Sequence, residues 1–441
     1  MEKPFTPRDV RGIYPSQVNE ELFYKIGRAI PQVFNLKKIV IGRDHRLSSD
    51  SLSDSLISGL IKQGVEVIDL GFTTSPTISI YAIENKIMSI MITASHNPKE
   101  YNGLKFGASD GNYIMYDDGI DKIEELVNKN IFFASEIEGI KNIVDFNSEY
   151  CSYLRNFIRK SDKKIKIAVD TGNGVGGPII EEIFKNVENI EIVPLFFEAD
   201  GNYPNHDADP SKEENISDLK KTIVEKNCDF GVAFDGDCDR CKIIDENANI
   251  LGSEEFLCIA AKFEENSNFD KIAYFDIWFS QSVKDFLKNI DYKFEALPMG
   301  AGNYRRALLE KGGTLASEFS GHIFFKENYC VDDGFFAFIK AINYYLMSDE
   351  KYSKLREGIL KWKSVNKNYR VDDAQNVIDR IVSNFSNGRI SRIDGVTIEF
   401  DDFWFNIRCS LTEPIIRMKV EAKNNKILDN KLSELENIIL I

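Results

Sequence analysis

Short apolar runs alternate with segments of helical spacing three times along this chain, and each series ends in a polar loop. Residues 38–42 and 87–93 are mainly apolar, with several apolar residues in succession, which is typical of strands buried on both faces. Because strand–helix alternation favours parallel or mixed sheets covered by helices, we predict three α/β units. Ligands of such sheets bind at the carboxyl ends of strands, so we expect the three polar loops to share one cleft.

The same order of elements is predicted in each unit. Spacing and β-branched content predict strands at 38–42, 65–70, 87–93, 165–170, 190–195, 230–234, 271–277, 293–297 and 314–318. They predict helices at 51–62, 76–84, 178–185, 216–227, 280–289 and 303–311. From about residue 362 the alternation stops, and strand-like runs at 395–400, 403–408 and 415–421 precede a terminal helix at 426–439. This segment is predicted to be a small α+β unit with an antiparallel sheet.

The charge and the cysteines narrow the class of protein. The net charge of −15 argues against nucleic-acid and anionic-membrane partners. Seven scattered cysteines fit a reducing compartment better than a disulfide framework, and the CxxC at Cys238 and Cys241 has no second copy that would indicate zinc. The amino terminus lacks a signal-peptide pattern and no apolar run is long enough to span a bilayer, so we expect a cytoplasmic protein.

The first polar loop reads ITASHNPKEYNGLKF, from Ile92 to Phe106. Ser95 follows the apolar run 87–93 and is followed by His96 and Lys105. A structural loop does not need these groups together, so we interpret Ser95 as a nucleophile or a phosphate acceptor.

The second polar loop reads DGDCDR and places Asp235, Asp237 and Asp239 at alternate positions after a strand. Three carboxylates this close repel one another unless a cation lies among them, and Mg²⁺ or Ca²⁺ takes such oxygen ligands. An EF-hand loop is excluded because Arg240 occupies the place of its required glycine.

The third loop and a later one offer groups for a sugar and for a phosphate. Glu318, Ser320 and His322 alternate donors and acceptors, which suits sugar hydroxyls, although a structural loop explains the pattern equally well. The later segment, RCSLTEPIIR, combines hydroxyls with two arginines whose guanidinium groups match phosphate oxygens; the alternative is a surface hairpin. We expect His45 and His206 to be ordinary loop residues. A serine acceptor, a metal loop, a hydroxyl-binding loop and an arginine-rich loop together fit phosphoryl transfer.

The motifs ITASHNP, DGDCDR, SEFSGHIFFKE and RCSLTEPIIR, in this order, resemble the α-D-phosphohexomutases, and most of all the bacterial and archaeal phosphomannomutase/phosphoglucomutase group. The segments RDVRG, IGRDHRLSS, DTGNGVGG and DGNYPNHDADP are similar to the same group. The resemblance implies four domains around a central cleft: three α/β domains with mixed sheets between helices and a smaller α+β domain. We place these domains at residues 1–146, 147–249, 250–361 and 362–441.

The resemblance also implies a role for each site residue. Ser95 would carry the phosphoryl group, and its phosphate oxygen would bind one Mg²⁺ with Asp235, Asp237 and Asp239. Lys105 would be the general acid or base, with His322 as the second candidate. The groups expected to steady the transferring phosphoryl group are Arg11, His96 and Arg240; those for the sugar hydroxyls are Glu318 and Ser320; those for the distal phosphate are Arg408, Ser410, Thr412 and Arg417.

The implied reaction interconverts hexose 1-phosphate and hexose 6-phosphate of mannose, glucose or both, through a 1,6-bisphosphate that turns around in the cleft. Glucose 1,6-bisphosphate or a similar compound would be the activator. The expected partner is a small hexose phosphate, and the expected state is a monomer or a homodimer.

Six positions depart from the pattern of the group: Arg8, Cys238, Trp278, Ala301, Ser317 and Leu411. Cys238 and Ser317 replace glycines, and Leu411 replaces Asn or Gly. Trp278 stands where the group tends to carry Lys, Ala301 where it tends to carry His, and Arg8 where it tends to carry Tyr. These last three changes remove substrate-contacting groups, so they concern the sugar rather than the chemistry.

Three alternatives remain. A haloacid-dehalogenase-type phosphatase or mutase would use Asp235 as the nucleophile but leaves Ser95 unexplained. A sugar-phosphate-binding protein without turnover is motivated by Trp278, Ala301 and Leu411. A phosphoglucosamine mutase is disfavoured because RDVRG differs from the TDGIRG-like start of that group.

Overall fold

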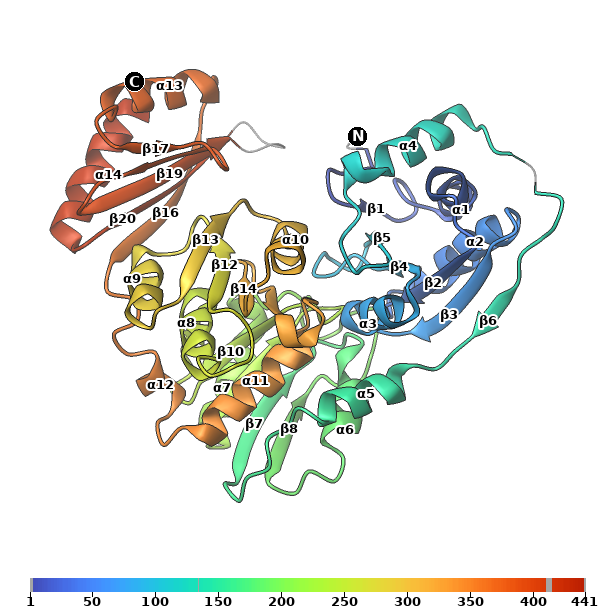
Figure 1. Ribbon diagram of the computed structural model, residues 1–441, viewed down its shortest axis with the longest axis horizontal. Helices are drawn as coiled ribbons and strands as arrows, with labels where there is room; N and C mark the ends of the chain where they lie inside the picture. Colours follow the sequence, from blue (N-terminus) through green and yellow to red (C-terminus); the bar gives the residue numbers. More distant parts are fainter. Residues whose placement is uncertain (1–2, 134, 410–414, 440–441) are drawn as a thin grey trace. The chain divides into compact units, whose positions relative to one another are not determined.

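The computed structural model describes residues 3–133, 135–409 and 415–439 (Figure 1). The chain forms two compact units, each built from two stretches of sequence. The first unit is Met1–Gly252 with Ser320–Lys354, and the second unit is Ser253–Phe319 with Leu355–Ile441.

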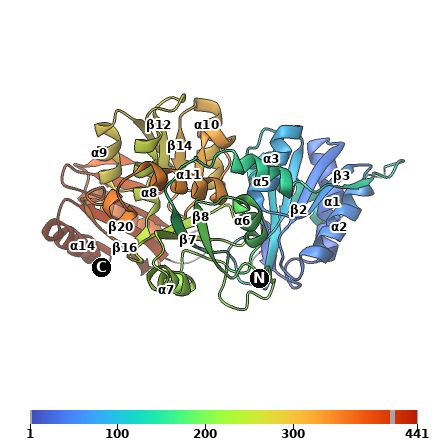
Figure 2. The ribbon, with the colours of Figure 1, turned by 90° about the horizontal axis from the view of Figure 1, so that it is seen from below.

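The first unit begins with a six-stranded mixed sheet. Its strands, in spatial order, are β1 (Val10–Ile13), β5 (Tyr101–Gly107), β4 (Met88–Ile92), β2 (Lys38–Arg43), β3 (Glu66–Phe72) and β6 (Lys141–Ile143). β4, β2, β3 and β6 are parallel, whereas β5 runs antiparallel to β4 and to β1. In Figure 2 the sheet lies between α3 (Ser75–Asn85) on one side and α1 (Glu20–Phe34) and α2 (Ser49–Ile61) on the other. α4 (Ile120–Lys129) packs on α1.

The second sheet of this unit has five strands. Their spatial order is β11 (Ile250–Leu251), β10 (Cys241–Asp245), β9 (Phe230–Phe234), β7 (Ile165–Asp170) and β8 (Ile190–Leu195). β7 is parallel to β8 and β9, and β10 is antiparallel to β9 and β11. The helices of this part are α5 (Asn147–Arg155), α6 (Gly176–Phe184), α7 (Ser217–Glu225) and α11 (Gly334–Met347). Phe335 and Phe338 of α11 pack against Phe234 of β9, so the returning stretch 320–354 completes this core.

The second unit contains three parallel strands of a third sheet and a fourth sheet that is antiparallel throughout. In the first of these, β12 (Ile272–Asp276) lies between β13 (Lys293–Leu297) and β14 (Leu315–Ser317). Its helices are α8 (Ser253–Phe263), α9 (Gln281–Asn289) and α10 (Ala301–Lys311). The carboxyl-terminal sheet has the order β16 (Lys363–Arg370), β20 (Ile415–Ala422), β19 (Phe403–Cys409), β18 (Val396–Glu399), β17 (Arg389–Ser391), and all its pairs are antiparallel. α13 (Ala374–Asn384) and α14 (Asn425–Ile439) cover it.

The remaining elements are short. They are β15 (Ile323–Phe325), α12 (Tyr352–Leu355) and three 3-10 turns at Tyr116–Asp118, Glu214–Ile216 and Lys326–Asn328.

Local signals in the sequence explain where the elements begin. Asn19, Thr74 and Asp333 cap α1, α3 and α11, because each side chain accepts a hydrogen bond from a backbone N–H of the first turn. All five residues of β4 and all five of β9 are buried. Such strands have helices on both faces, as their mainly apolar sequences predict.

α1 and α2 approach one another closely at two glycines. A Cβ added to Gly27 would lie 2.3 Å from the carbonyl oxygen of Leu56, and one added to Gly59 would lie 2.2 Å from that of Tyr24. The two glycines therefore let the helix backbones touch.

The structure confirms three α/β domains with mixed sheets and a fourth domain with an antiparallel sheet. The structure has four of the predicted strands at the predicted residues: 165–170, 190–195, 230–234 and 293–297 coincide with β7, β8, β9 and β13. The sequence did not predict α1, α4, α5, α8, α11, α12 and α13. Among the described residues, no helix is both long and apolar enough to cross a membrane.

Candidate active site

Ser95 lies just past β4, in a turn that the backbone holds in an unusual conformation. Its φ is 51°, in the left-handed region that serine seldom adopts, and the residue is 1% exposed. Its N–H donates to Thr93 Oγ1 at 2.8 Å, and its hydroxyl donates to Asp235 Oδ2 at 2.8 Å. The sheet thus places the serine directly against the loop that follows β9.

The three aspartates of that loop converge, as their alternation predicts. Asp235, Asp237 and Asp239 are buried, and one carboxylate oxygen from each lies within 4.8 Å of the other two. Lys105 lies on β5. Its ammonium group donates to Asp237 Oδ2 at 2.6 Å and to Asp239 Oδ2 at 2.5 Å. The buried Oδ1 atoms of Asp237 and Asp239 accept no hydrogen bond from the described part of the chain. Buried oxygen acceptors that are left over in this way fit a hard divalent cation.

Ser75 supports the same loop and was not predicted from the sequence. Its backbone N–H donates to the carbonyl of Asp237 at 3.0 Å, and its hydroxyl donates to Asp237 Oδ2 at 2.5 Å. Ser75 is the first residue of α3, so the positive end of this helix faces the acidic loop. The sequence predicted only a helix from Pro76, and the partner of Ser75 lies more than 160 residues away along the chain.

Arg240 and His96 flank the serine hydroxyl. An Nη atom of Arg240 lies 2.5 Å from Ser95 Oγ and also contacts His96 Nδ1, while Nε donates to Asp235 Oδ2 at 3.0 Å. Burial, together with the charge of Arg240, lowers the pKa of His96 to about 3. His96 is therefore neutral and can accept the hydrogen bond of Arg240.

The pKa values of the ionisable groups in and around the acidic loop are shifted in opposite directions. Burial raises the pKa of Asp235 against the effect of Arg240, and the adjacent carboxylates add to this increase. Burial also acts on Asp239, but Lys105, His322 and Arg240 outweigh it and lower the pKa of that carboxyl. For Lys105, burial is outweighed by Asp237, Asp239 and Asp235, which raise its pKa. Lys105 is therefore a charged donor in this arrangement.

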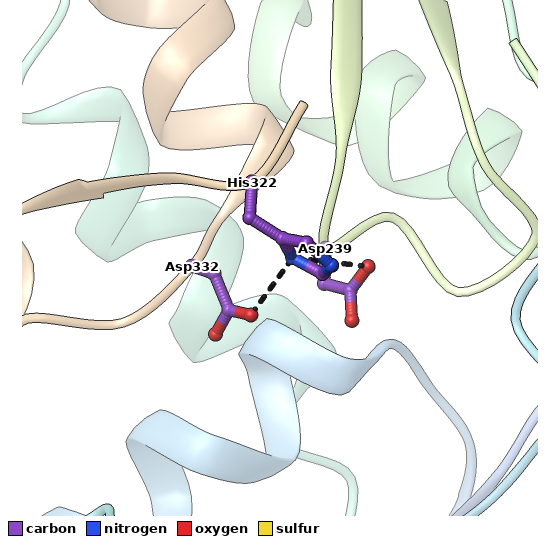
Figure 3. Close-up of side chains that lie close together, drawn as sticks. All are labelled: Asp239, His322 and Asp332. Atoms are coloured by element: carbon purple, nitrogen blue, oxygen red, sulfur yellow. Dashed lines mark ion pairs between the residues drawn. The ribbon is translucent and has the colours of Figure 1, made fainter. Parts of the chain in front are cut away.

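His322 approaches the acidic loop from the returning stretch of the first unit (Figure 3). Its Nδ1 lies 3.0 Å from Asp332 Oδ2 and 3.8 Å from Asp239 Oδ1. Asp332 also accepts the hydroxyl of Tyr113 at 2.7 and 2.9 Å. Burial opposes protonation, but Asp239 and Asp332 outweigh it and raise the pKa of His322. Asp332 and Tyr113 were not among the predicted site residues.

Arg11 lies on β1, which pairs with β5. Its guanidinium donates to the carbonyl of Ala94 at 3.2 Å and to Asn97 Oδ1 at 2.8 Å, and pairs with Asp9 at 2.6 Å. The first unit therefore brings together Ser95, His96, Arg11, Lys105, the three aspartates, Arg240 and His322.

The predicted sugar-binding residues are divided between the two units. Glu318 belongs to the second unit, where its Oε1 accepts the backbone N–H of Gly300 at 2.7 Å. Asp276, also in the second unit, is fully buried, and burial raises its pKa to about 7. Ser320 begins the returning stretch of the first unit.

The two arginines predicted to bind phosphate lie at paired positions on adjacent strands of the carboxyl-terminal sheet. Arg408 on β19 and Arg417 on β20 are paired residues of the antiparallel ladder. Arg408 pairs with Asp394 at 3.2 Å and lies over the ring of Trp278 at 4.8 Å. The indole N–H of Trp278 donates to Asn406 Oδ1 at 2.8 Å. Ser410, Leu411 and Thr412 lie outside the described residues.

Two other departures have a clear structural setting. Cys238 has a φ of 62° and is fully buried, so a side chain stands where the backbone conformation favours glycine. Ala301 is the first residue of α10, after Gly300, whose φ is 130°. Of the two histidines expected in loops, His45 stacks on Phe72 with ring centroids 4.0 Å apart, and His206 pairs with Asp170 at 3.2 Å.

Three family models match this chain in succession. Their descriptions are phosphoglucomutase/phosphomannomutase, alpha/beta/alpha domains I, II and III, and they match residues 2–133, 148–250 and 253–361. A phosphomannomutase of Methanocaldococcus jannaschii is 32% identical and covers 99% of this chain and 97% of its own length. The chain belongs to the phosphoglucomutase/phosphomannomutase family.

Other members of the family agree along the full length. A phosphoglucomutase of Neisseria gonorrhoeae is 31% identical, over 99% of this chain and 96% of that protein. The crystal structure of a phosphoglucomutase/phosphomannomutase family protein from Burkholderia thailandensis superimposes with a TM-score of 0.89 at 26% identity, covering 99% of this chain and 96% of that one. As a phosphoglucomutase/phosphomannomutase family member, the chain is an enzyme, an intramolecular phosphotransferase of the isomerase class.

Proposed function

We propose that this enzyme interconverts the 1-phosphate and the 6-phosphate of a hexose, mannose or glucose, with Ser95 as the phosphoryl carrier. The observation that carries the proposal is the setting of the Ser95 hydroxyl. It lies 2.8 Å from Asp235 Oδ2 and 2.5 Å from Arg240, beside three buried carboxylates and the ammonium group of Lys105. Little covalent assistance is needed for phosphoryl transfer, which depends on positioned charge of this kind.

In the proposed reaction, the bond between Ser95 Oγ and phosphorus breaks as a sugar hydroxyl oxygen bonds to phosphorus. The hydroxyl proton passes to a base, and the product is a hexose 1,6-bisphosphate. After the bisphosphate turns around, its other phosphoryl group returns to Ser95 and the departing sugar oxygen takes a proton. Arg240, which contacts Ser95 Oγ and neutral His96, would hold the serine oxygen in place during both transfers.

Lys105 and His322 are the candidates for moving the proton. Both lie beside Asp239 and are largely shielded from solvent, and acidic neighbours raise the pKa of each, so each carries a proton next to the place where a sugar oxygen would depart. The same residue would take the proton back in the reverse direction. Mg²⁺ held by Asp235, Asp237, Asp239 and a phosphoserine oxygen would neutralise charge on the transferring group.

The remaining residues are proposed to bind the sugar phosphate. We assign the sugar hydroxyls to Glu318 and Ser320, and the distal phosphate to Arg408 and Arg417 with Ser410 and Thr412. The paired positions of the two arginines on adjacent strands support this assignment, because they place two guanidinium groups side by side. One Mg²⁺ per chain and a trace of glucose 1,6-bisphosphate complete the proposal, and a neighbour of the same fold is described as an N-acetylphosphoglucosamine mutase in complex with glucose 1,6-bisphosphate.

Phosphorus NMR tests the proposal with purified protein, Mg²⁺, a trace of glucose 1,6-bisphosphate and, in separate tubes, mannose 1-phosphate, glucose 1-phosphate and glucosamine 1-phosphate. We expect the 6-phosphate to form from mannose or glucose 1-phosphate. Ser95→Ala should abolish the conversion, whereas Ser152→Ala, at an exposed serine of α5, should not affect it.

Other products would identify other functions. Full activity of Ser95→Ala, or orthophosphate as the main product, would contradict the proposal and indicate an aspartate nucleophile or a phosphatase. Conversion of glucosamine 1-phosphate alone would change the sugar and keep the chemistry. Tight binding without product would indicate a binding protein.

A further inference from the structure

Arg46 is buried beneath the turn that carries Ser95, and its guanidinium faces backbone oxygens rather than the reacting hydroxyl. Its side chain has no exposed surface. Its two Nη atoms donate to four carbonyls of a single loop. One Nη donates to Pro98 at 2.7 Å and to Tyr101 at 2.9 Å. The other donates to Ser95 at 2.8 Å and to Asn97 at 2.7 Å. Nε donates to Asp44 Oδ2 at 3.1 Å.

We propose that Arg46 is a positioning residue of the transfer reaction, which sets the conformation of the loop from Ser95 to Tyr101 and thereby the position of Ser95 Oγ. The inference rests on the proposed role of Ser95 as the phosphoryl carrier. Arg46 bonds to the backbone of Ser95 and not to its hydroxyl, so it acts through Ser95.

The chemistry of the contact explains why an arginine stands here. The loop winds around one point, so four of its carbonyls aim at the same buried place. A planar guanidinium offers five N–H donors in a fixed fork, and lysine offers three donors on a single atom. A buried carbonyl that loses its donor pays a desolvation cost, so the loop would have to change its path if the fork were removed.

Ser95 itself needs such support. Its φ of 51° is unfavourable for a residue with a Cβ and persists only where the surroundings fix it. The carbonyl of Ser95 is fixed from two sides: Arg46 donates to it at 2.8 Å, and a Cβ on Gly236 would lie 2.7 Å from it. Gly236 lies between Asp235 and Asp237, so the loop of the three aspartates and the loop of Ser95 touch at the atom that Arg46 holds.

Arg46 is itself held in place. Asp44 Oδ1 accepts the backbone N–H of Arg46 at 3.0 Å and the hydroxyl of Ser49 at 2.6 Å, which aims its other oxygen at Nε. On the far side, the ring of Tyr203 lies 5.4 Å from the guanidinium carbon. A Cβ on Gly201 would lie 2.3 Å from the carbonyl of His45, so the Tyr203 loop packs tightly on this turn.

Arg43 is a matched control in the same segment. It is also largely buried and paired with acids, at 2.6 Å to Asp50 and 3.3 Å to Asp69, but these contacts lie away from the Ser95 loop. Arg46→Lys and Arg43→Lys therefore make the same chemical change at two positions, of which only Arg46 contacts the carbonyls of the Ser95 loop.

The first measurement is steady-state kinetics of both variants with the hexose phosphate that the wild-type enzyme converts. Arg46→Lys should lower kcat about 10- to 100-fold, because a displacement of about 1 Å at a reacting group costs this much. KM should change less than about threefold, since the groups proposed to bind the sugar and distal phosphate are untouched. Arg43→Lys should retain kcat within about twofold. A fully folded Arg46→Lys protein with wild-type kcat would overturn the proposal.

The second measurement does not depend on any activity. Hydrogen exchange followed by mass spectrometry should show faster exchange in peptides spanning residues 93–103 of Arg46→Lys and no change there in Arg43→Lys. If the wild-type protein converts no hexose phosphate, the proposed function fails, and the exchange result still decides whether Arg46 holds the loop. Equal exchange of this segment in the two variants contradicts the role of Arg46.

Discussion

Cys238 places a side chain at a position of the acidic loop where the backbone conformation favours glycine. Its φ of 62° lies in the left-handed region, and the thiol is fully buried. A Cβ on Gly176 would lie 2.8 Å from Sγ of Cys238, so the glycine of the DTGNGVGG segment makes room for the thiol. The two residues therefore depend on one another.

A double-mutant cycle measures this dependence. Gly176→Ala should lower the free energy of unfolding by about 1–3 kcal/mol in the wild-type background, because the added methyl group overpacks the thiol. In a Cys238→Gly background the same change should cost much less, since the obstructing atom is gone. Chemical denaturation of the four proteins gives the coupling energy, and equal costs in both backgrounds would show that the pair is independent.

The sequence singled out the residues that we propose to react and missed those that support them. Asp235, Asp237 and Asp239 were found because alternating carboxylates after a strand have a direct chemical meaning. Arg46 and Asp332 act through contacts with residues that are distant in the sequence. No local pattern marks such contacts, and only the fold reveals them.

Two helices of the first domain are joined by an unusually close contact. The backbones of α1 and α2 meet at Gly27 and Gly59, where an added Cβ would come within 2.3 Å of a carbonyl oxygen of the other helix. An alanine in a helix normally stabilises it by about 0.5–1 kcal/mol relative to glycine.

We expect the opposite sign at this contact. Gly27→Ala and Gly59→Ala should each lower the free energy of unfolding by about 2–3 kcal/mol, because the helices must separate. Ser58→Ala, at an exposed position of α2 beside Gly59, should change it by less than about 0.5 kcal/mol. Urea denaturation measures all three, and a stabilised Gly27→Ala would show that the helices move apart at no cost.

The loop after β8 is tied to the end of β7 by a titratable contact. His206 Nε2 lies 3.2 Å from Asp170 Oδ2, and its Nδ1 lies 2.8 Å from the carbonyl of Asp207. Burial opposes the charged form of His206, but the hydrogen bond with Asp170 outweighs it and raises the pKa above its ordinary value of 6.5.

The sign of the pH dependence follows from this increase. The stabilisation is fully present below pH 6.5, where the histidine is charged in both states, and it is lost as the pH rises through the pKa of the folded protein. The melting temperature of the wild-type protein should therefore fall relative to that of His206→Gln as the pH rises from 6 to 8. Parallel melting curves across this range would contradict the charged pair.

The elements differed in how well their sequences revealed them. β7, β8, β9 and β13 were predicted to the residue because apolar residues recur in each at the spacing of a strand. α11 was missed because it is apolar on nearly all sides, and eleven of its fourteen residues are buried. A helix that is buried all round has no polar face, so its sequence lacks the period of an amphipathic helix.

At the scale of the whole molecule, the three tryptophans are distributed unevenly. Trp278, Trp362 and Trp404 all belong to the second unit, whereas the acidic loop belongs to the first. Tryptophan fluorescence therefore reports on the second unit, and far-ultraviolet circular dichroism reports on both.

Binding of Mg²⁺ should separate the two signals. A cation held by the three aspartates stabilises the first unit, so adding Mg²⁺ should raise the melting temperature followed by circular dichroism more than the one followed by fluorescence. Chelation should reverse the shift, and Asp237→Asn should reduce it. Equal shifts of both signals would show that the two units unfold as one cooperative body.

The interleaving of the two units also has a consequence for the newly made chain on the ribosome. Synthesis proceeds from the amino terminus, and domains fold as they emerge. The first unit cannot close when residue 252 leaves the exit tunnel, because α11 and His322 arrive only with the stretch 320–354. Phe230 and Phe234 therefore lack their partners Phe338 and Phe335 while the first segment of the second unit is translated. During this interval the apolar side chains of β9 lack their partners, so we expect the nascent chain to be most prone to aggregation then.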